Sequence, residues 1–142
     1  MTNTDNLNPI KPSLVELLQQ ACDGLLFMSE SEYPLEVFTW QIEENNPVNI
    51  ESIIKKTGHP TQTSVGVIDL DTFFAQAIEE NDWYSPEEIE VAKKFQHLVK
   101  IIKNNLIDVV VYRLGEVEID VYILGKASNS EYVGIMTQVV ET

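Results

Sequence analysis

The sequence predicts a mixed α+β fold in which a largely antiparallel sheet carries helices on both faces. Its centre is a hairpin, Ile107 to Leu124, whose two strand-like runs meet at Leu114-Gly115. The first run is nearly all apolar, and strands that lose the alternation of polar and apolar residues are those buried on both faces. A long amphipathic stretch at 85–106 supplies one of the covering helices.

A turn at Leu114-Gly115 fixes the register of the hairpin, and it predicts the pairs Arg113–Glu116, Tyr112–Val117 and Val110–Ile119. Three acidic residues of the second strand then share one face: Glu116, Glu118 and Asp120. Such a row binds a cation, imitates phosphates, or is simply a solvent-facing strand edge that discourages pairing with other chains. The residues alone leave these readings open.

The remaining elements follow from capping signals and periodicity. Ser13 with Glu16 and Ser85 with Glu88 form capping boxes, and Asn49 is a further cap residue. The predicted helices are Ser13 to Asp23, Ile50 to Thr57, a short one capped by Asp71 and running to about Glu80, and Ser85 to Leu106. Further strands are predicted at Leu35 to Ile42, Val65 to Leu70 and Tyr132 to Val140, with a polar loop at Glu43 to Pro47 and a turn at Lys126 to Ser130.

Length and composition predict one domain, residues 13–142, preceded by a flexible tail, Met1 to Pro12. The formal charge of -14 and the pI near 4.3 disfavour nucleic-acid binding and favour a basic partner protein, although acidity also keeps a protein soluble. The single cysteine, Cys22, allows no internal disulfide and falls on an apolar stripe. Neither a signal peptide nor a membrane span is apparent, so we expect a cytoplasmic protein.

One motif suggests an enzyme. VGVIDLDTF, Val65 to Phe73, resembles the nucleophile motif of haloacid-dehalogenase-type phosphatases, in which Asp69 would attack phosphorus and Asp71 would act as acid and base beside Mg²⁺. That family also needs a paired-Asp loop and a longer parallel sheet, and no such loop follows Thr72. The other reading is that Asp69 ends a strand and Asp71 caps a helix.

The histidines predict no catalytic or metal centre. His59 lies in a TGHP loop with no carboxylate or cysteine beside it in sequence, and His97 falls on the polar side of the longest helix. Neither belongs to a zinc-ligand spacing or a catalytic triad, and the chain carries no Gly-rich phosphate loop. We therefore expect no cofactor and no metal site of the protein's own.

Two features suggest an interface. Trp83, between Asp82 and Tyr84, either packs on the core or is presented outward, where aromatic residues on loops anchor protein complexes. Thr142 ends the chain with a hydroxyl and a terminal carboxylate, which suit Mg²⁺ or a basic pocket. C-termini are more commonly frayed and inert, so composition alone does not decide its role.

Several blocks, taken in order, resemble the nuclease A inhibitor family of cyanobacteria. They are DGLLFMSESEYP (Asp23 to Pro34), TGH (Thr57 to His59), DWY (Asp82 to Tyr84), VYRLGEVEIDVYILG (Val111 to Gly125) and VVET (Val139 to Thr142). The resemblance runs from about Ser13 to the last residue. It implies an α-β-α sandwich similar to plant pathogenesis-related class 1 proteins.

The resemblance also implies a function. It predicts a non-enzymatic inhibitor that plugs the active site of a Mg²⁺-dependent endonuclease acting on both DNA and RNA, in a 1:1 complex. In this reading Thr142 reaches the catalytic Mg²⁺ of the partner, Glu30 enters its active site, and Asp82 and Trp83 lie at the interface. The alternative is a protein-binding module of the same fold with a different partner; a phosphatase-like enzyme using Asp69 and Asp71 is a third reading.

Overall fold

The computed structural model describes residues 13–41, 48–128 and 131–142. Its elements are α1 Leu14–Cys22, β1 Leu26–Met28, β2 Glu32–Pro34, β3 Glu36–Gln41, α2 Ile50–Lys56, β4 Val65–Ile68, α3 Leu70–Phe74, α4 Pro86–Asn105, β5 Ile107–Leu114, β6 Glu118–Ser128 and β7 Glu131–Val140. The predicted tail, Met1 to Pro12, and the predicted loop, Glu43 to Pro47, lie outside the described residues.

Five strands form one antiparallel sheet in the order β3-β7-β6-β5-β4, and β1 pairs with β2 in a separate hairpin. The longest pairing joins β6 to β7, from Glu118 opposite Val140 to Ser128 opposite Glu131. On its other edge, β7 pairs with β3 only through its first half, from Glu131 to Met136. The second half of that edge faces the β1–β2 hairpin, which contacts β7 through both of its strands.

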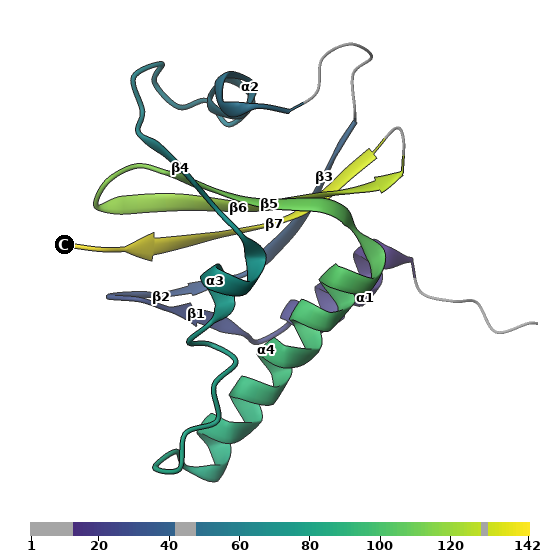
Figure 1. Ribbon diagram of the computed structural model, residues 1–142, viewed down its shortest axis with the longest axis vertical. Coiled ribbons are helices and arrows are strands. Elements are labelled where there is room, and N and C mark those ends of the chain that lie inside the picture. Colours follow the sequence, from purple (N-terminus) through teal and green to yellow (C-terminus); the bar gives the residue numbers. More distant parts are fainter. Residues whose placement is uncertain (1–12, 42–47, 129–130) are drawn as a thin grey trace, which may run out of the picture.

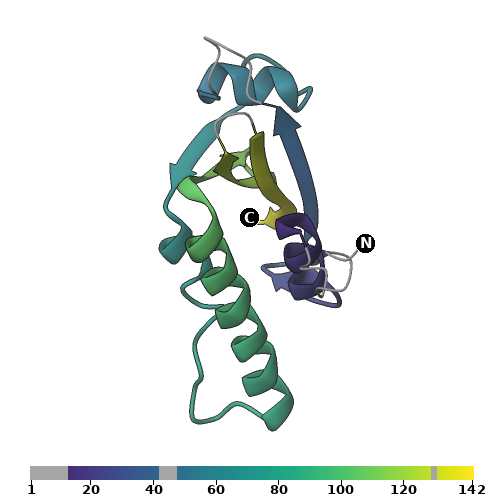
Figure 2. The ribbon, with the colours of Figure 1, turned by 90° about the vertical axis from the view of Figure 1, so that its right-hand side faces the viewer.

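Helices cover both faces of the sheet (Figures 1 and 2). On one face α1, α3, α4 and the β1–β2 hairpin bury residues such as Leu18, Phe74 and Leu98 against Val111 and Ile123. On the other face α2 packs Ile53 against a second cluster, and its members from the sheet include Tyr112, Leu114, Leu124 and Tyr132. The predicted fold class, mixed α+β with an antiparallel sheet between helices, is confirmed.

The predicted double burial of the first hairpin strand is also confirmed. Val111 is fully buried on the α4 side of the sheet, and the adjacent Tyr112 is buried on the α2 side. Adjacent residues of a strand point to opposite faces, so β5 is covered on both. This explains why its sequence lacks alternation.

The register predicted for the hairpin is wrong, and none of the three predicted pairs forms. Arg113 lies opposite Val121, and its predicted partner Glu116 lies in the turn. The connection is longer than a two-residue turn because residues 115–117 belong to neither strand, and the first two residues of β6 pair with β7. At its other end β6 continues to Ser128, through the first part of the turn predicted at Lys126 to Ser130.

The helix starts were predicted well, with one exception. The capping boxes of Ser13–Glu16 and Ser85–Glu88 form, and Asn49 caps α2. The cap of α3 is Asp69 rather than Asp71, because the Asp69 carboxylate accepts both the N–H and the hydroxyl of Thr72, at 3.0 and 2.6 Å. The helix then ends at Phe74 rather than near Glu80, and the chain continues in turns.

A further prediction concerns the environment of the single cysteine. Cys22 is buried in the core, as predicted, and burial raises the pKa of its thiol to about 11, so that the reactive thiolate is disfavoured.

Among the helices of the described segments, none is long and apolar enough to cross a membrane.

The close contact between β3 and the centre of β7 predicts a strong effect of Gly134→Ala. A Cβ at Gly134 would collide with the Phe38 ring and lie 2.6 Å from the carbonyl oxygen of Ile123. Overpacking of this kind costs about 1–3 kcal/mol of unfolding free energy, measurable by urea denaturation. Gly66→Ala is the matched control because its Cβ would meet only the Arg113 Cβ, at 3.9 Å. Equal losses in the two variants would contradict this account.

Candidate functional site

The C-terminus leaves the sheet between two turns (Figure 1). One turn, Ser29 to Ser31, joins β1 to β2, and the other, Gly115 to Val117, joins β5 to β6. We call these two turns and residues Val140 to Thr142 the terminal tip. The tip exists because β7 pairs with β6 up to Val140, which brings the last residues of the chain beside the start of β6, next to the β5–β6 turn.

The β1–β2 turn holds the end of β7 through backbone and hydroxyl groups. The Glu30 N–H donates to the Val140 carbonyl at 3.2 Å, and the Val140 N–H donates to the Ser29 hydroxyl at 2.9 Å. The turn itself is closed by the Ser29 N–H, which donates to the Ser31 carbonyl at 2.8 Å. These bonds extend the pairing of β7 beyond the five-stranded sheet and bring Glu30 to the last residue.

Glu30 and Thr142 contact one another directly. The Thr142 backbone N–H donates to Glu30 Oε2 at 2.7 Å, and the Thr142 hydroxyl donates to Glu30 Oε1 at 2.7 Å. These two bonds hold the pKa of the Glu30 carboxyl below its ordinary value, and the bond from the hydroxyl has the larger effect. Both residues are exposed, so the pair presents a carboxylate, a hydroxyl and the terminal carboxylate to solvent.

The penultimate residue is held from the opposite side. The Glu141 N–H donates to the Val117 carbonyl at 2.9 Å, and the Glu141 carboxylate pairs with Arg113 Nη2 at 2.5 Å. Arg113 is half-buried and Glu141 is exposed, so the ion pair joins the chain end to the body of the sheet and orients it. These contacts were not predicted, because the wrong hairpin register assigned Arg113 to Glu116.

The terminal tip is strongly acidic. Its exposed carboxylates come from all three segments and from the residues that adjoin them: Glu30, Glu32, Glu116, Glu118, Glu141 and the C-terminus. A group of carboxylates on one surface repels anions and attracts a basic surface. This local charge agrees in sign with the formal charge of -14 of the whole chain.

Asp82 and Trp83 lie elsewhere, in the loop before α4. Trp83 is 79% exposed, and it makes an edge contact with the ring of Tyr84, with centroids 6.2 Å apart. The loop sits at the end of α4 remote from the sheet (Figures 1 and 2). Because α4 has 20 residues, this end is about 30 Å from the start of β5. The question left open by the sequence is resolved: Trp83 is presented outward.

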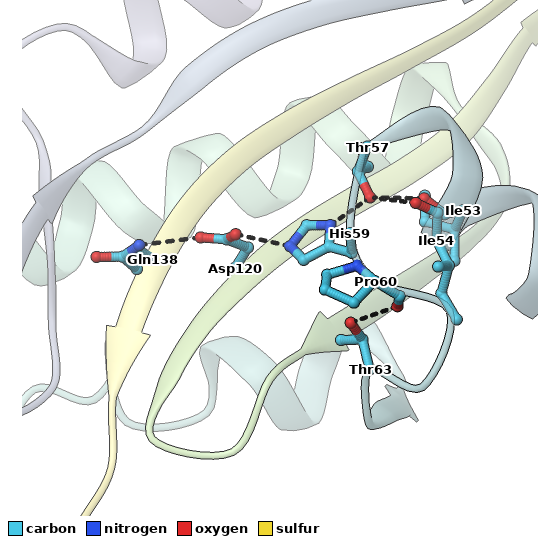
Figure 3. A network of polar contacts seen from close by, with 8 residues as sticks. All are labelled: Ile53, Ile54, Thr57, His59, Pro60, Thr63, Asp120 and Gln138. Atoms are coloured by element: carbon cyan, nitrogen blue, oxygen red, sulfur yellow. Dashed lines mark hydrogen bonds and ion pairs between the residues drawn. The ribbon is translucent and has the colours of Figure 1, made fainter.

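The acidic row of β6 is divided between two environments. Glu118 is exposed, whereas Asp120 is half-buried between His59 and Gln138, with contacts of 2.8 and 2.9 Å (Figure 3). The carboxylate that His59 lacks in its own loop therefore comes from β6. Asp120 lies on a central strand, so the reading of this row as a sheet edge is wrong.

The same network contains a Thr–His–Asp sequence of contacts, because the Thr57 hydroxyl lies 2.5 Å from His59 Nδ1 (Figure 3). A nucleophilic triad needs a hydroxyl free to attack a substrate. The Thr57 hydroxyl instead donates to the Ile53 carbonyl at 2.7 Å and so closes the last turn of α2. The network ties the loop after α2 to β6 and β7, which is a structural role.

The motif that suggested a phosphatase also has a structural role here. Both oxygens of Asp69 bind Thr72, and these bonds, the hydroxyl bond first, hold the pKa of the Asp69 carboxyl below its ordinary value. Asp71 pairs with Lys103 at 2.6 Å. The strand before Asp69 is β4, an edge strand that runs antiparallel to β5. Within the described segments, no group of three or more His, Cys, Asp and Glu residues is arranged to hold a metal ion.

Comparison with protein families gives one match that covers nearly the whole chain. Residues 12–142 match the family described as Nuclease A inhibitor-like protein. The chain belongs to this family. A search of curated proteins found no match. Membership of the nuclease A inhibitor-like family fits a non-enzymatic protein whose partner is a nuclease, and it agrees with the structural roles of Asp69 and Asp71.

The Glu30–Thr142 contact predicts a pH-dependent release of the C-terminus. A carboxyl whose folded-state pKa is lowered contributes stability above its unfolded pKa and loses it as pH falls through the folded value. We expect the Thr142 amide resonance, followed by NMR from neutral pH downward, to shift as Glu30 gains a proton below the ordinary carboxyl pKa, in addition to the shift that the terminal carboxylate of Thr142 itself causes.

Glu30→Gln is expected to remove the contribution of Glu30 and leave only the shift that the terminal carboxylate of Thr142 causes, whereas the neighbouring Glu32→Gln is the matched control that should retain the full transition. Identical titration curves of the Thr142 resonance in Glu30→Gln and in the unmodified protein would contradict the contact.

Proposed function

We propose that this protein inhibits a Mg²⁺-dependent, non-specific nuclease by inserting the terminal tip into its active-site cleft. The observation that carries the proposal is the direct contact of Glu30 with Thr142 at an exposed, acidic chain end. Family membership supplies the class of partner. Residues 13–142 would form the inhibitory domain.

Electrostatics supports such a partner. A cleft that binds nucleic acid is basic and holds a divalent cation, because its substrate is a polyanion. A protein of charge -14, with carboxylates concentrated at one tip, would be attracted to that cleft and would associate faster at low salt. The same charge opposes direct binding of DNA or RNA. We therefore propose a 1:1 protein complex without contact to nucleic acid.

The chemistry of Thr142 fits a role at the metal of the partner. Mg²⁺ prefers oxygen ligands, and Thr142 offers a hydroxyl oxygen and two carboxylate oxygens. In the Glu30 contact the hydroxyl is the donor, so the lone pairs of its oxygen are not used in that bond and are left as potential ligands. A carboxylate that accepts the proton of a ligating group orients that group and increases its basicity. Glu30 would therefore prepare Thr142 for the cation.

Contacts on both sides of the chain end reduce the entropic cost of binding. The backbone N–H groups of residues 140–142 each donate a hydrogen bond, to the Ser29 hydroxyl, the Val117 carbonyl and the Glu30 carboxylate respectively. A free chain end would lose about 1–2 kcal/mol of backbone entropy per residue on being fixed in a cleft. Ordering these residues in advance raises affinity without any new contact.

Asp82 and Trp83 would form a second part of the interface. Trp83 is the most exposed of the large apolar residues in the described part of the chain, and buried tryptophans are common hot spots. An interface that includes both this loop and the terminal tip has to bridge from the remote end of α4 to the end of the sheet where β7 finishes (Figure 1). Such an extended footprint suits a nuclease cleft with a broad rim.

Deletion of Thr142 is expected to weaken inhibition at least about thirtyfold, the equivalent of the ~2 kcal/mol typical of a hot spot. The measurement is the inhibition constant against a purified Mg²⁺-dependent endonuclease that degrades DNA and RNA, with the C-terminus free of any tag. An added C-terminal residue should have a similar effect, because it displaces the carboxylate.

Two controls accompany this measurement. Thermal unfolding should be unchanged in the deletion, since Thr142 is exposed, and inhibition by the unmodified protein should persist in excess Mg²⁺, which excludes chelation. An inhibition constant that the deletion leaves unchanged would refute the role of Thr142 at the metal.

Trp83→Ala is expected to weaken inhibition by a similar factor of about thirty, because it removes a large exposed side chain that would be buried in the complex. Unfolding free energy should change by less than about 0.5 kcal/mol, as for other surface substitutions. Equal inhibition by the variant and the unmodified protein would remove this loop from the interface.

A further inference from the structure

Two exposed apolar side chains lie on either side of the chain end. Met28 is 63% exposed at the end of β1, and Val117 is 50% exposed in the β5–β6 turn. Single exposed apolar residues are common on protein surfaces and need no explanation by themselves. What distinguishes this pair is its position on either side of the same chain end.

The hydrogen bonds of the chain end fix both positions. Met28 precedes Ser29 and Glu30, the two residues that bind Val140 and Thr142. Val117 is itself a contact of the chain end, because its carbonyl accepts the Glu141 N–H at 2.9 Å. The C-terminal residues therefore emerge between two segments (Figure 1). Each of these segments carries one of the two apolar residues beside acidic ones.

The fold does not explain why these two side chains are apolar. Ile119, two residues after Val117, belongs to the core, as does Phe27 before Met28. Met28 and Val117 belong to neither core cluster. Turns favour Gly, Asn, Asp and Ser, so a valine between Glu116 and Glu118 is not required by turn geometry.

Binding supplies a reason. A tip made only of carboxylates would lose hydration on entering a cleft, and desolvation of charges offsets much of their attraction to a basic surface. Burial of apolar area, by contrast, contributes to affinity directly, and methionine adapts its shape to irregular surfaces. Interfaces accordingly combine apolar contacts with charged groups that steer the encounter.

We propose that Met28 and Val117 bury against apolar surface on opposite walls of the nuclease cleft while the acidic groups between them approach the metal. This inference rests on the proposed function. It extends that function from the metal-directed Thr142 to the neighbouring turns, and it predicts that the walls of the cleft near the metal are apolar in part.

The test uses the full-length protein without a C-terminal tag, carrying Met28→Ala, Val117→Ala or both. We expect each single variant to raise the inhibition constant against a purified Mg²⁺-dependent DNA and RNA endonuclease about tenfold. Ile107→Ala is the matched control. Ile107 is 67% exposed and lies at the other end of β5 from the tip, so its truncation should leave inhibition unchanged.

Salt dependence separates apolar contact from electrostatics. Burial of apolar surface is not screened, so the factor lost in Met28→Ala and Val117→Ala should be the same at low and high ionic strength. Val117→Thr, which keeps the shape but adds a hydroxyl, should lose inhibition as Val117→Ala does. Thermal unfolding of each variant should match that of the unmodified protein, which rules out a folding defect as the cause.

The outcomes distinguish this inference from the proposed function. If the unmodified protein inhibits and loses inhibition on deletion of Thr142, but both alanine variants inhibit within twofold of it, the apolar contacts are refuted and the proposed function stands. If the unmodified protein does not inhibit the nuclease, the proposed function itself fails.

Discussion

The pairing of β7 is the constraint on which the rest of the structure depends. β7 pairs with β6 up to Val140, but with β3 only through its first half, because β3 begins at Glu36 opposite Met136. The unpaired half of this edge accepts the β1–β2 turn, whose Glu30 N–H binds the Val140 carbonyl. Both faces of the sheet are buried, so a slip in register would expose core residues and is disfavoured. The same pairing therefore builds the core and fixes the chain end.

The elements of the fold could be predicted because their signals are local. The capping boxes at Ser13 and Ser85 and the unbroken apolar run of β5 each act within a few residues. The hairpin register could not be predicted in this way, because β7, which is remote in sequence, pairs with the first residues of β6 and lengthens the turn. The prediction of the cap residue of α3 was wrong for a different reason. Asp69 and Asp71 are both good cap residues, and only the position of Thr72 decides between them.

The candidate site likewise combines residues that the sequence could indicate with contacts that only the fold brings about. Glu30 and Thr142 are 112 residues apart, and no local pattern relates them; the family resemblance singled out both. Arg113 and Ser29 lie in blocks that carry the resemblance, but the resemblance gave them no role at the site, although they hold the residues next to Thr142. A partner for Arg113 was predictable in kind, since an arginine on a well-covered strand needs a carboxylate, but its identity as Glu141 required the correct register. Residues that position a site are thus harder to predict than residues that form it.

The contact between Glu30 and Thr142 also suits the proposed mechanism, in which Thr142 has to bind a cation of the nuclease. Both residues are exposed, so water competes for the two hydrogen bonds and their net contribution to stability is small. They are strong enough to favour one position of the chain end and weak enough to adjust when a cation approaches. A buried pair would hold Thr142 more firmly, but the cation could not reach it without unfolding the tip. Exposure is therefore a requirement of the proposed mechanism, and the two flanking turns supply the order that an exposed pair alone would lack.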